Sequence, residues 1–210
     1  MHRYEYGKKD ASHLLIQLID KHSLPMMEKE IDAIQNEAGD DFHLIAFEVN
    51  DWNDDLSPWK APAVFGDHAF AGGAEETLAV ILSEIQGDPR RCYLGGYSLA
   101  GLFSLWAGCR MDAFAGIAAA SPSLWYPRFL DYLEANSMKA DKVYLSLGDQ
   151  EEKTRNARMA TVGDCVRAAH GIFQNEGILT TLAWNPGNHF KAPELRTAKA
   201  FAWLLQKEHE

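Results

Sequence analysis

A serine flanked by small residues is the strongest candidate for chemistry in this chain. Ser98 lies within residues 95–101, GGYSLAG, with Gly96 two positions before it and Ala100 two positions after it. A strand-like run precedes this turn, and an apolar helical run, 99–109, follows it. A strand, a tight turn and a helix form a nucleophile elbow, which pushes the serine Oγ above the edge of a sheet. The pattern predicts a nucleophilic Ser98, although a glycine-rich turn with a capping serine would have the same sequence.

Two later segments supply the other groups that an activated serine needs. Residues 148–152, GDQEE, follow one strand-like run, and residues 185–190, NPGNHF, follow another. An imidazole takes the serine proton and returns it to the leaving group, while a carboxylate holds the imidazole in the correct tautomer. Serine, acid, histidine is one of the chain orders in which such triads occur.

We therefore predict that His189 is the general base and that Glu151 is the triad acid. Glu151 stands three residues after Gly148, which is a suitable reach for this role. Asp149 and Glu152 are alternatives, and at least two of these three acids belong to a solvated loop.

The oxyanion that forms when a serine attacks a carbonyl group needs two hydrogen-bond donors. The backbone N–H of Leu99, directly after the nucleophile, is expected to be one of them. The other is expected from the loop after a predicted strand at 13–19, where Asp20 and Lys21 are available and Lys21 is favoured.

Strand-like and helix-like patterns alternate along the whole chain, which is typical of a mostly parallel sheet with helices on both faces. Strands are predicted at 13–19, 42–49, 91–95, 114–120, 142–147 and 179–184. Helices are predicted at 23–38, 77–86, 99–109 and 127–135, with further helical faces at 162–173 and 195–205 and a loop at 50–73. In such sheets the chemistry takes place at the carboxyl ends of the strands, where all three candidate groups fall.

Composition excludes several other classes of protein. The chain has 210 residues and a formal net charge of −10, so it repels polyanions and no nucleic-acid partner is expected. It has no run of 18 apolar residues, so no membrane span is expected. Three cysteines without metal-ligand spacing suggest a reducing, cytoplasmic compartment and no metal site. We expect no cofactor, a small-molecule ester as partner, and a homodimer as a plausible assembly.

With these residues in place, the chain resembles a family of α/β-hydrolases that contains esterase D-like and enterochelin esterase-like enzymes. The resemblance rests on GGYSLAG (95–101), SPSLWY (121–126), SLGDQEEK (146–153) and GNHF (187–190), and it spans nearly the whole chain. It implies an α/β-hydrolase fold, here as a single domain over 1–210 without a cap domain, with Ser98 as nucleophile and His189 as base. Glu151 follows less directly, because some members of the family work with a serine–histidine pair. Ala100 stands where glycine is more usual, and the loop after residue 19 lacks the family's common glycine.

Aromatic residues near these loops are expected to form a substrate pocket. We predict that Trp52, Trp125 and Tyr126 line it, whereas Trp59 is at least as well explained by packing of its loop. An acidic run at 51–55 either disfavours anionic substrates or is a solvated loop. The predicted activity is hydrolysis of a carboxylic ester through an acyl-enzyme. An acyltransferase or thioesterase using the same triad, or a catalytically silent binding protein, is the alternative.

Overall fold

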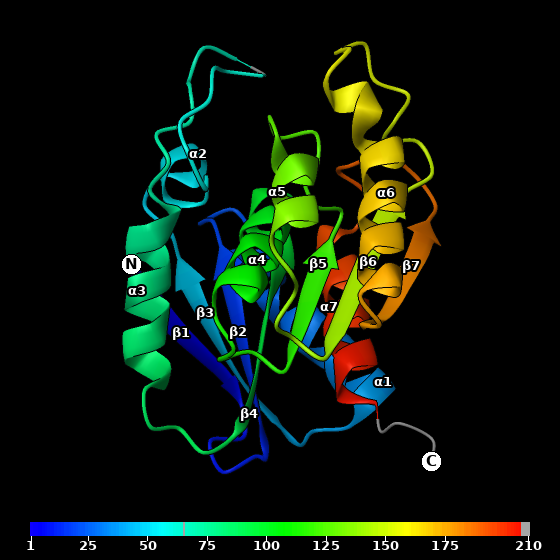
Figure 1. Ribbon diagram of the computed structural model, residues 1–210. Helices are drawn as coiled ribbons and strands as arrows, with labels where there is room; N and C mark the ends of the chain where they lie inside the picture. The colour runs from blue at the N-terminus through cyan, green and yellow to red at the C-terminus, as the bar shows by residue number, and fades with distance from the viewer. Residues whose placement is uncertain (65, 207–210) are drawn as a thin grey trace.

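One sheet in the order β1-β3-β2-β4-β5-β6-β7 runs through the described part of the chain (Figure 1). The computed structural model describes residues 1–64 and 66–206. Residue 65, in the predicted loop 50–73, and residues 207–210, at the end of the predicted domain, lie outside the described residues. The strands are β1 (His2–Gly7), β2 (His13–Ile19), β3 (Phe42–Glu48), β4 (Arg91–Tyr97), β5 (Gly116–Ala120), β6 (Lys142–Gly148) and β7 (Leu179–Asn185). β1 is antiparallel to β3, and all other neighbours are parallel.

Helices cover both faces of the sheet (Figure 1). They are α1 (Met27–Ala38), α2 (Trp52–Asp55), α3 (Ala74–Ile85), α4 (Leu99–Arg110), α5 (Phe129–Ala135), α6 (Val162–Asn175) and α7 (Pro193–Leu205). α3, α4, α5 and α6 contribute to the hydrophobic core on one face, and α1 and α7 contribute to the core on the other.

The β2 strand shows why the central strands are apolar throughout. Leu14, Ile16 and Leu18 point into the core beneath α3 to α6, whereas Leu15 and Ile19 point into the core beneath α1 and α7. Successive side chains of a strand face opposite sides, so a strand that is covered on both faces needs an uninterrupted apolar run. This confirms the predicted α/β architecture with a mostly parallel sheet.

β1 is the strand that the sequence prediction missed. It lies at the edge of the sheet, and only Tyr4 and Tyr6 alternate as half-buried side chains among exposed ones. An edge strand needs few apolar residues, so its sequence lacks the buried run by which the other strands were recognised.

The predicted loop 50–73 contains the one-turn helix α2. The Asp51 carboxylate caps it by accepting hydrogen bonds from the backbone N–H groups of Asn53, at 3.0 Å, and Asp54, at 2.9 Å. Such a short helix has too few residues to show a periodic pattern. Two other helix starts also differ from the prediction: α1 is preceded by a 3-10 turn (Leu24–Met26), and α3 begins at Ala74.

Within the described residues, none of the helices has the length and apolar character that a membrane crossing requires. Cys92 and Cys109 are buried, Cys165 is half-buried, and all three are free thiols.

Candidate active site

The turn between β4 and α4 holds Ser98 in a strained backbone conformation. Its φ is 60° and its ψ is −119°, which is rare for a residue with a side chain. The turn is so tight that a Cβ atom on Gly96 would lie 2.5 Å from the Cβ atom of Ala100. A side chain at position 96 is therefore excluded by contact, and the predicted need for a small residue there is explained.

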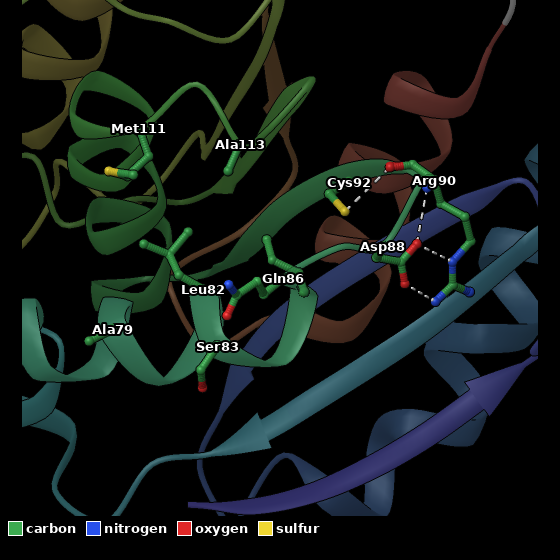
Figure 2. A pocket seen from close by; sticks show the side chains of 10 residues that line it. Ala79, Leu82, Ser83, Gln86, Asp88, Arg90, Cys92, Met111 and Ala113 are labelled. Atoms are coloured by element: carbon green, nitrogen blue, oxygen red, sulfur yellow. Dashed lines mark hydrogen bonds and ion pairs between the residues drawn. The ribbon is translucent and has the colours of Figure 1, made fainter.

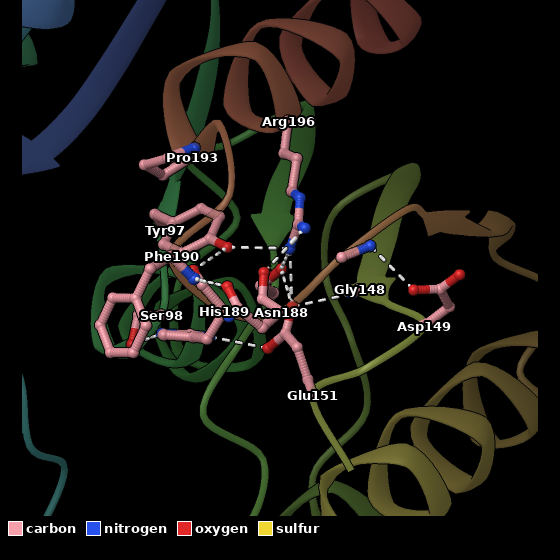
Figure 3. A network of polar contacts seen from close by, with 12 residues as sticks. Tyr97, Ser98, Gly148, Asp149, Glu151, Asn188, His189, Phe190, Pro193 and Arg196 are labelled. Carbon is pink, nitrogen blue, oxygen red and sulfur yellow. Dashed lines mark hydrogen bonds and ion pairs between the residues drawn. The ribbon is translucent and has the colours of Figure 1, made fainter. Parts of the chain in front are cut away.

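Three loops at the carboxyl ends of parallel strands bring Ser98, Glu151 and His189 together (Figure 3). The Nε2 atom of His189 lies 3.1 Å from the Oγ atom of Ser98. On the other side of the ring, Nδ1 lies 2.7 Å from Oε2 of Glu151. The distances place an acceptor for the serine proton on one ring nitrogen and a carboxylate on the other.

Glu151 is buried, yet its surroundings favour the ionised carboxylate. Its side chain is 3 % exposed, and burial alone would raise the carboxyl pKa. The hydrogen bond and charge of His189 outweigh this effect, together with hydrogen bonds from the Gly148 N–H and the Ser121 hydroxyl, so the pKa is lowered overall. The carboxylate can therefore stay charged beside the imidazole.

The two alternative acids have other partners. The Asp149 carboxylate accepts a hydrogen bond of 2.8 Å from the backbone N–H of Gly187, and this bond lowers its pKa. Glu152 forms an ion pair of 3.3 Å with Arg167 on α6. Of the three acids, the structure brings Glu151 to His189.

Four polar residues around these groups were not predicted. The Ser121 hydroxyl donates to Glu151 Oε1 at 2.8 Å, and the Ser123 hydroxyl lies 3.1 Å from that of Ser98. The Tyr97 hydroxyl donates to the backbone carbonyl of His189 at 2.8 Å, and Arg196 forms an ion pair of 2.7 Å with Glu151.

The sequence offers a hint of Arg196, since it is a charged residue within the apolar helical pattern at 195–205. Ser121 and Ser123 belong to the SPSLWY segment, where the sequence alone gives them no role.

A cavity of about 470 Å³ opens beside the serine and histidine. Trp52 and Trp125, two of the residues expected at a substrate pocket, line it. The full lining is Asp20, Ser23, Trp52, Tyr97, Ser98, Ser123, Trp125, Met159, His189, Phe190 and Pro193. Aromatic rings form much of this wall, which suits an apolar or planar part of a substrate.

Tyr126 requires a correction, because it is packed away from this cavity. Its side chain is only 2 % exposed and meets the rings of Trp59 and Phe70 edge-on. Its hydroxyl donates to the backbone carbonyl of Trp59. The residue after Trp125 turns inward to anchor the loop that carries Trp59, so Tyr126 is structural.

The two expected oxyanion donors, the backbone N–H groups of Leu99 and Lys21, lie in different surroundings. Leu99 is the first residue of α4, where a backbone N–H has no acceptor within its own helix. Lys21 lies in the exposed turn after β2, one residue beyond Asp20, which lines the cavity. The oxyanion role of both N–H groups stays a prediction.

A larger hollow of about 640 Å³ lies far from these groups, between the end of α3, the start of β4 and the segment after α4 (Figure 2). Its charged residues, Asp88 and Arg90, satisfy each other in an ion pair of 2.6 Å. Burial raises the pKa of the Cys92 thiol to about 11, so this sulfur is not a nucleophile near neutral pH. The chemistry-bearing groups converge at the other end of the sheet.

One group of described side chains has metal-ligand spacing: Asp51, Asp54 and His68, whose ligand atoms lie within 4.8 Å of one another. The side chains are 41 %, 35 % and 58 % exposed, respectively. Asp51 caps α2, and Asp54 accepts from the backbone N–H of Ala71 at 3.0 Å. These hydrogen bonds account for the position of the two carboxylates, which stabilise the fold of the loop.

The sheet order, the strained serine turn and the order of the three groups define an α/β-hydrolase fold. Solved structures of the same fold include the siderophore hydrolase EstA from Aspergillus nidulans, with a TM-score of 0.70, 17 % identity and coverage of 97 % of this chain and 94 % of that one. An IroE-like serine hydrolase from Shewanella oneidensis matches with a TM-score of 0.77, 14 % identity and coverage of 97 % and 75 %. The enterobactin esterase FES from Shigella flexneri matches with a TM-score of 0.70, 15 % identity and coverage of 96 % and 54 %.

These likenesses are of fold, because every identity is well below that at which function is shared reliably. The structures are nevertheless of the same group of esterases that the sequence motifs resemble. No family model and no curated protein sequence matches the chain.

Proposed function

We propose that this protein is a serine hydrolase that cleaves a carboxylic ester through an acyl-enzyme. In this proposal Ser98 is the nucleophile, His189 is the general base and Glu151 is the carboxylate of the triad. The observation that carries the proposal is the pair of contacts made by one imidazole, 3.1 Å to Ser98 Oγ and 2.7 Å to Glu151 Oε2. The strained turn at Ser98 and the adjoining cavity support it.

In the first half of the reaction, Ser98 Oγ attacks the ester carbonyl carbon and its proton passes to His189 Nε2. The carbonyl oxygen becomes an oxyanion, for which the Leu99 N–H is the first proposed donor. Collapse of the tetrahedral intermediate breaks the bond to the alcohol oxygen, which takes the proton from His189. The acyl group remains on Ser98.

In the second half, a water molecule repeats the attack on the acyl carbon. His189 Nε2 accepts a proton from the water and returns it to Ser98 Oγ as the carboxylic acid leaves. Glu151 stabilises the imidazolium in both halves, because its Oε2 accepts from Nδ1. Glu151 stays ionised throughout, in accord with its lowered pKa.

The substrate proposed is a small ester with an apolar or planar part that fits between Trp52, Trp125 and Phe190. Two of the structural neighbours are named as a siderophore hydrolase and an enterobactin esterase, which supports an ester as the substrate. A cytoplasmic location is proposed from the free thiols and remains separate from the mechanism.

A fluorophosphonate probe and a panel of p-nitrophenyl esters test this function. The probe should label Ser98 and no other serine, and ester hydrolysis should disappear in Ser98→Ala. Hydrolysis that survives in Ser98→Ala would overturn the mechanism. A folded native protein that neither reacts with the probe nor cleaves any ester would instead indicate a binding protein with a hydrolase fold.

A further inference from the structure

Arg196 is a buried charge at the centre of a network that joins four loops (Figure 3). Its side chain is 4 % exposed and lies in the first turns of α7. Nη1 donates to Glu151 Oε1 at 2.7 Å, to the Tyr97 hydroxyl at 3.0 Å and to the Ser121 hydroxyl at 3.1 Å. Nη2 donates to the backbone carbonyls of Asn188, at 2.9 Å, and Pro186, at 3.4 Å. The guanidinium therefore contacts residues at the ends of four strands, β4, β5, β6 and β7.

The contacts divide the two oxygens of Glu151 between separate tasks. Oε1 accepts from Arg196, from Ser121 and, at 2.7 Å, from the backbone N–H of Gly148. Oε2 is left for His189. Because three donors fix Oε1, the carboxylate cannot rotate without breaking them, and Oε2 stays aimed at Nδ1.

Arg196 also reaches His189 through the backbone. The Asn188 carbonyl, which it binds, belongs to the residue directly before His189. The Tyr97 hydroxyl accepts from Arg196 and donates to the His189 carbonyl. A single planar fork with several donors suits this task, whereas the point charge of a lysine would satisfy only part of it.

We propose that Arg196 is a positioning residue for the Glu151–His189 pair, and that its fixed positive charge limits how strongly this pair holds a proton. The inference deepens the function proposed above and rests on it for its catalytic meaning. Burying a guanidinium costs free energy unless the charge is paired and its N–H groups are hydrogen-bonded. The Glu151 carboxylate and two backbone carbonyl groups supply these partners for Arg196.

The charge effect follows from simple electrostatics. A proton bound by the pair adds positive charge beside a permanent cation, so removal of the cation must strengthen proton binding. Among the described residues that line the cavity with His189, the other titratable groups are Tyr97 from β4 and Asp20 after β2. Burial raises the pKa of Tyr97 to about 12, so it stays neutral near pH 7. Arg196 is thus the cation that a neutralising substitution would remove.

The test compares Arg196→Gln, Arg196→Lys and wild type as full chains labelled with ¹⁵N-histidine. Nitrogen NMR follows protonation of the His189 ring against pH, and a His189→Gln spectrum identifies its signals. In Arg196→Gln the midpoint of protonation should rise by about one pH unit, which is about tenfold tighter proton binding. In Arg196→Lys the midpoint should stay near that of wild type, while kcat falls about tenfold at an unchanged KM. The matched control is Arg110→Gln, which removes a surface arginine paired with Glu75 and should move neither quantity.

An unchanged midpoint in Arg196→Gln would overturn the charge effect, and an unchanged kcat in Arg196→Lys would overturn the positioning role. If Arg196→Gln does not give a folded spectrum, the kcat and KM of Arg196→Lys decide between the positioning role and a merely structural one. The NMR midpoint needs no substrate. A raised midpoint in a protein without esterase activity would therefore support the charge effect while rejecting the proposed function.

Discussion

The hydroxyl of Ser123 lies 3.1 Å from the hydroxyl of Ser98, and the two residues are also joined by a backbone hydrogen bond of 3.1 Å from the Ser123 N–H to the Ser98 carbonyl. Ser98 has one hydroxyl proton, and His189 Nε2 lies at the same distance of 3.1 Å. If Ser98 donates to His189, Ser123 must be the donor to Ser98. This arrangement would direct the Ser98 proton toward the imidazole, as the proposed attack requires.

Ser123→Ala should therefore lower kcat by about fivefold to tenfold, the effect of losing one neutral hydrogen bond of about 1 kcal/mol. Steady-state kinetics on a p-nitrophenyl ester measures it. Ser104→Ala is the control, because it removes another buried hydroxyl, one that donates to the Ala100 carbonyl within α4. A loss of a thousandfold in Ser123→Ala would make Ser123 a participant in the chemistry, and no loss would remove the orienting role.

The three acids after β6 should separate clearly when each is replaced by its amide. Glu151→Gln should lower kcat by about 10³-fold to 10⁴-fold, because an amide does not stabilise the imidazolium. Asp149→Asn should stay near wild type, since an amide oxygen can still accept from the Gly187 N–H. Glu152→Gln should also stay near wild type, because its partner Arg167 is an exposed surface residue. Measured kcat values decide the assignment, and an Asp149→Asn variant slower than Glu151→Gln would reverse it.

The proposed nucleophile and base could be picked out from sequence because their signals are local. Ser98 needs only the strand, small neighbours and helix around it, and His189 needs only its place after a strand. Parallel strands then bring these ends to one edge of the sheet whatever their separation in the chain. This reasoning required no knowledge of side-chain packing, and the fold that it assumed is the one observed.

Arg196 and Tyr126 show where that reasoning fails. Arg196 is 45 residues from Glu151 in the chain, and their contact depends on how α7 packs against the sheet. Tyr126 follows Trp125 directly and both rings are buried, yet only Trp125 also lines the cavity, a difference that the sequence does not reveal. Edge strand β1 was missed for a related reason, since its burial depends on a neighbour and not on its own composition.

Trp52 should contribute to substrate binding, because its half-buried ring lines the cavity. Trp52→Ala should raise KM for a p-nitrophenyl ester with a bulky acyl group about tenfold, and should affect the acetate less, since a smaller acyl group buries less surface. Tyr126→Phe is the matched control: it should leave KM unchanged and lower the melting temperature, because it loses the hydrogen bond to Trp59. Equal effects of Trp52→Ala on all acyl lengths would contradict a role in binding the acyl group.

Glu30 should make the stability of the protein fall as pH rises. It is 3 % exposed in α1, and no hydrogen-bond partner of its Oε1 is present among the described residues. Burial raises its pKa well above the ordinary value of 4.5; the charge of Glu194 adds to this effect, and a hydrogen bond with Gln17 opposes it. The folded state therefore prefers the protonated carboxyl.

The sign of the effect follows from linkage. Above about pH 4.5 the unfolded chain releases this proton while the folded chain keeps it, so the free energy of unfolding decreases with rising pH until Glu30 ionises in the folded state. The slope from one such group is at most about 1.4 kcal/mol per pH unit. Glu30→Gln keeps the shape of the side chain without the proton, so its stability relative to wild type should increase from pH 5 to pH 8. Urea unfolding at these two pH values measures the difference, with Glu28→Gln on the exposed face of the same helix as control. If Glu30→Gln and Glu28→Gln change stability equally at both pH values, Glu30 does not carry a proton in the folded protein.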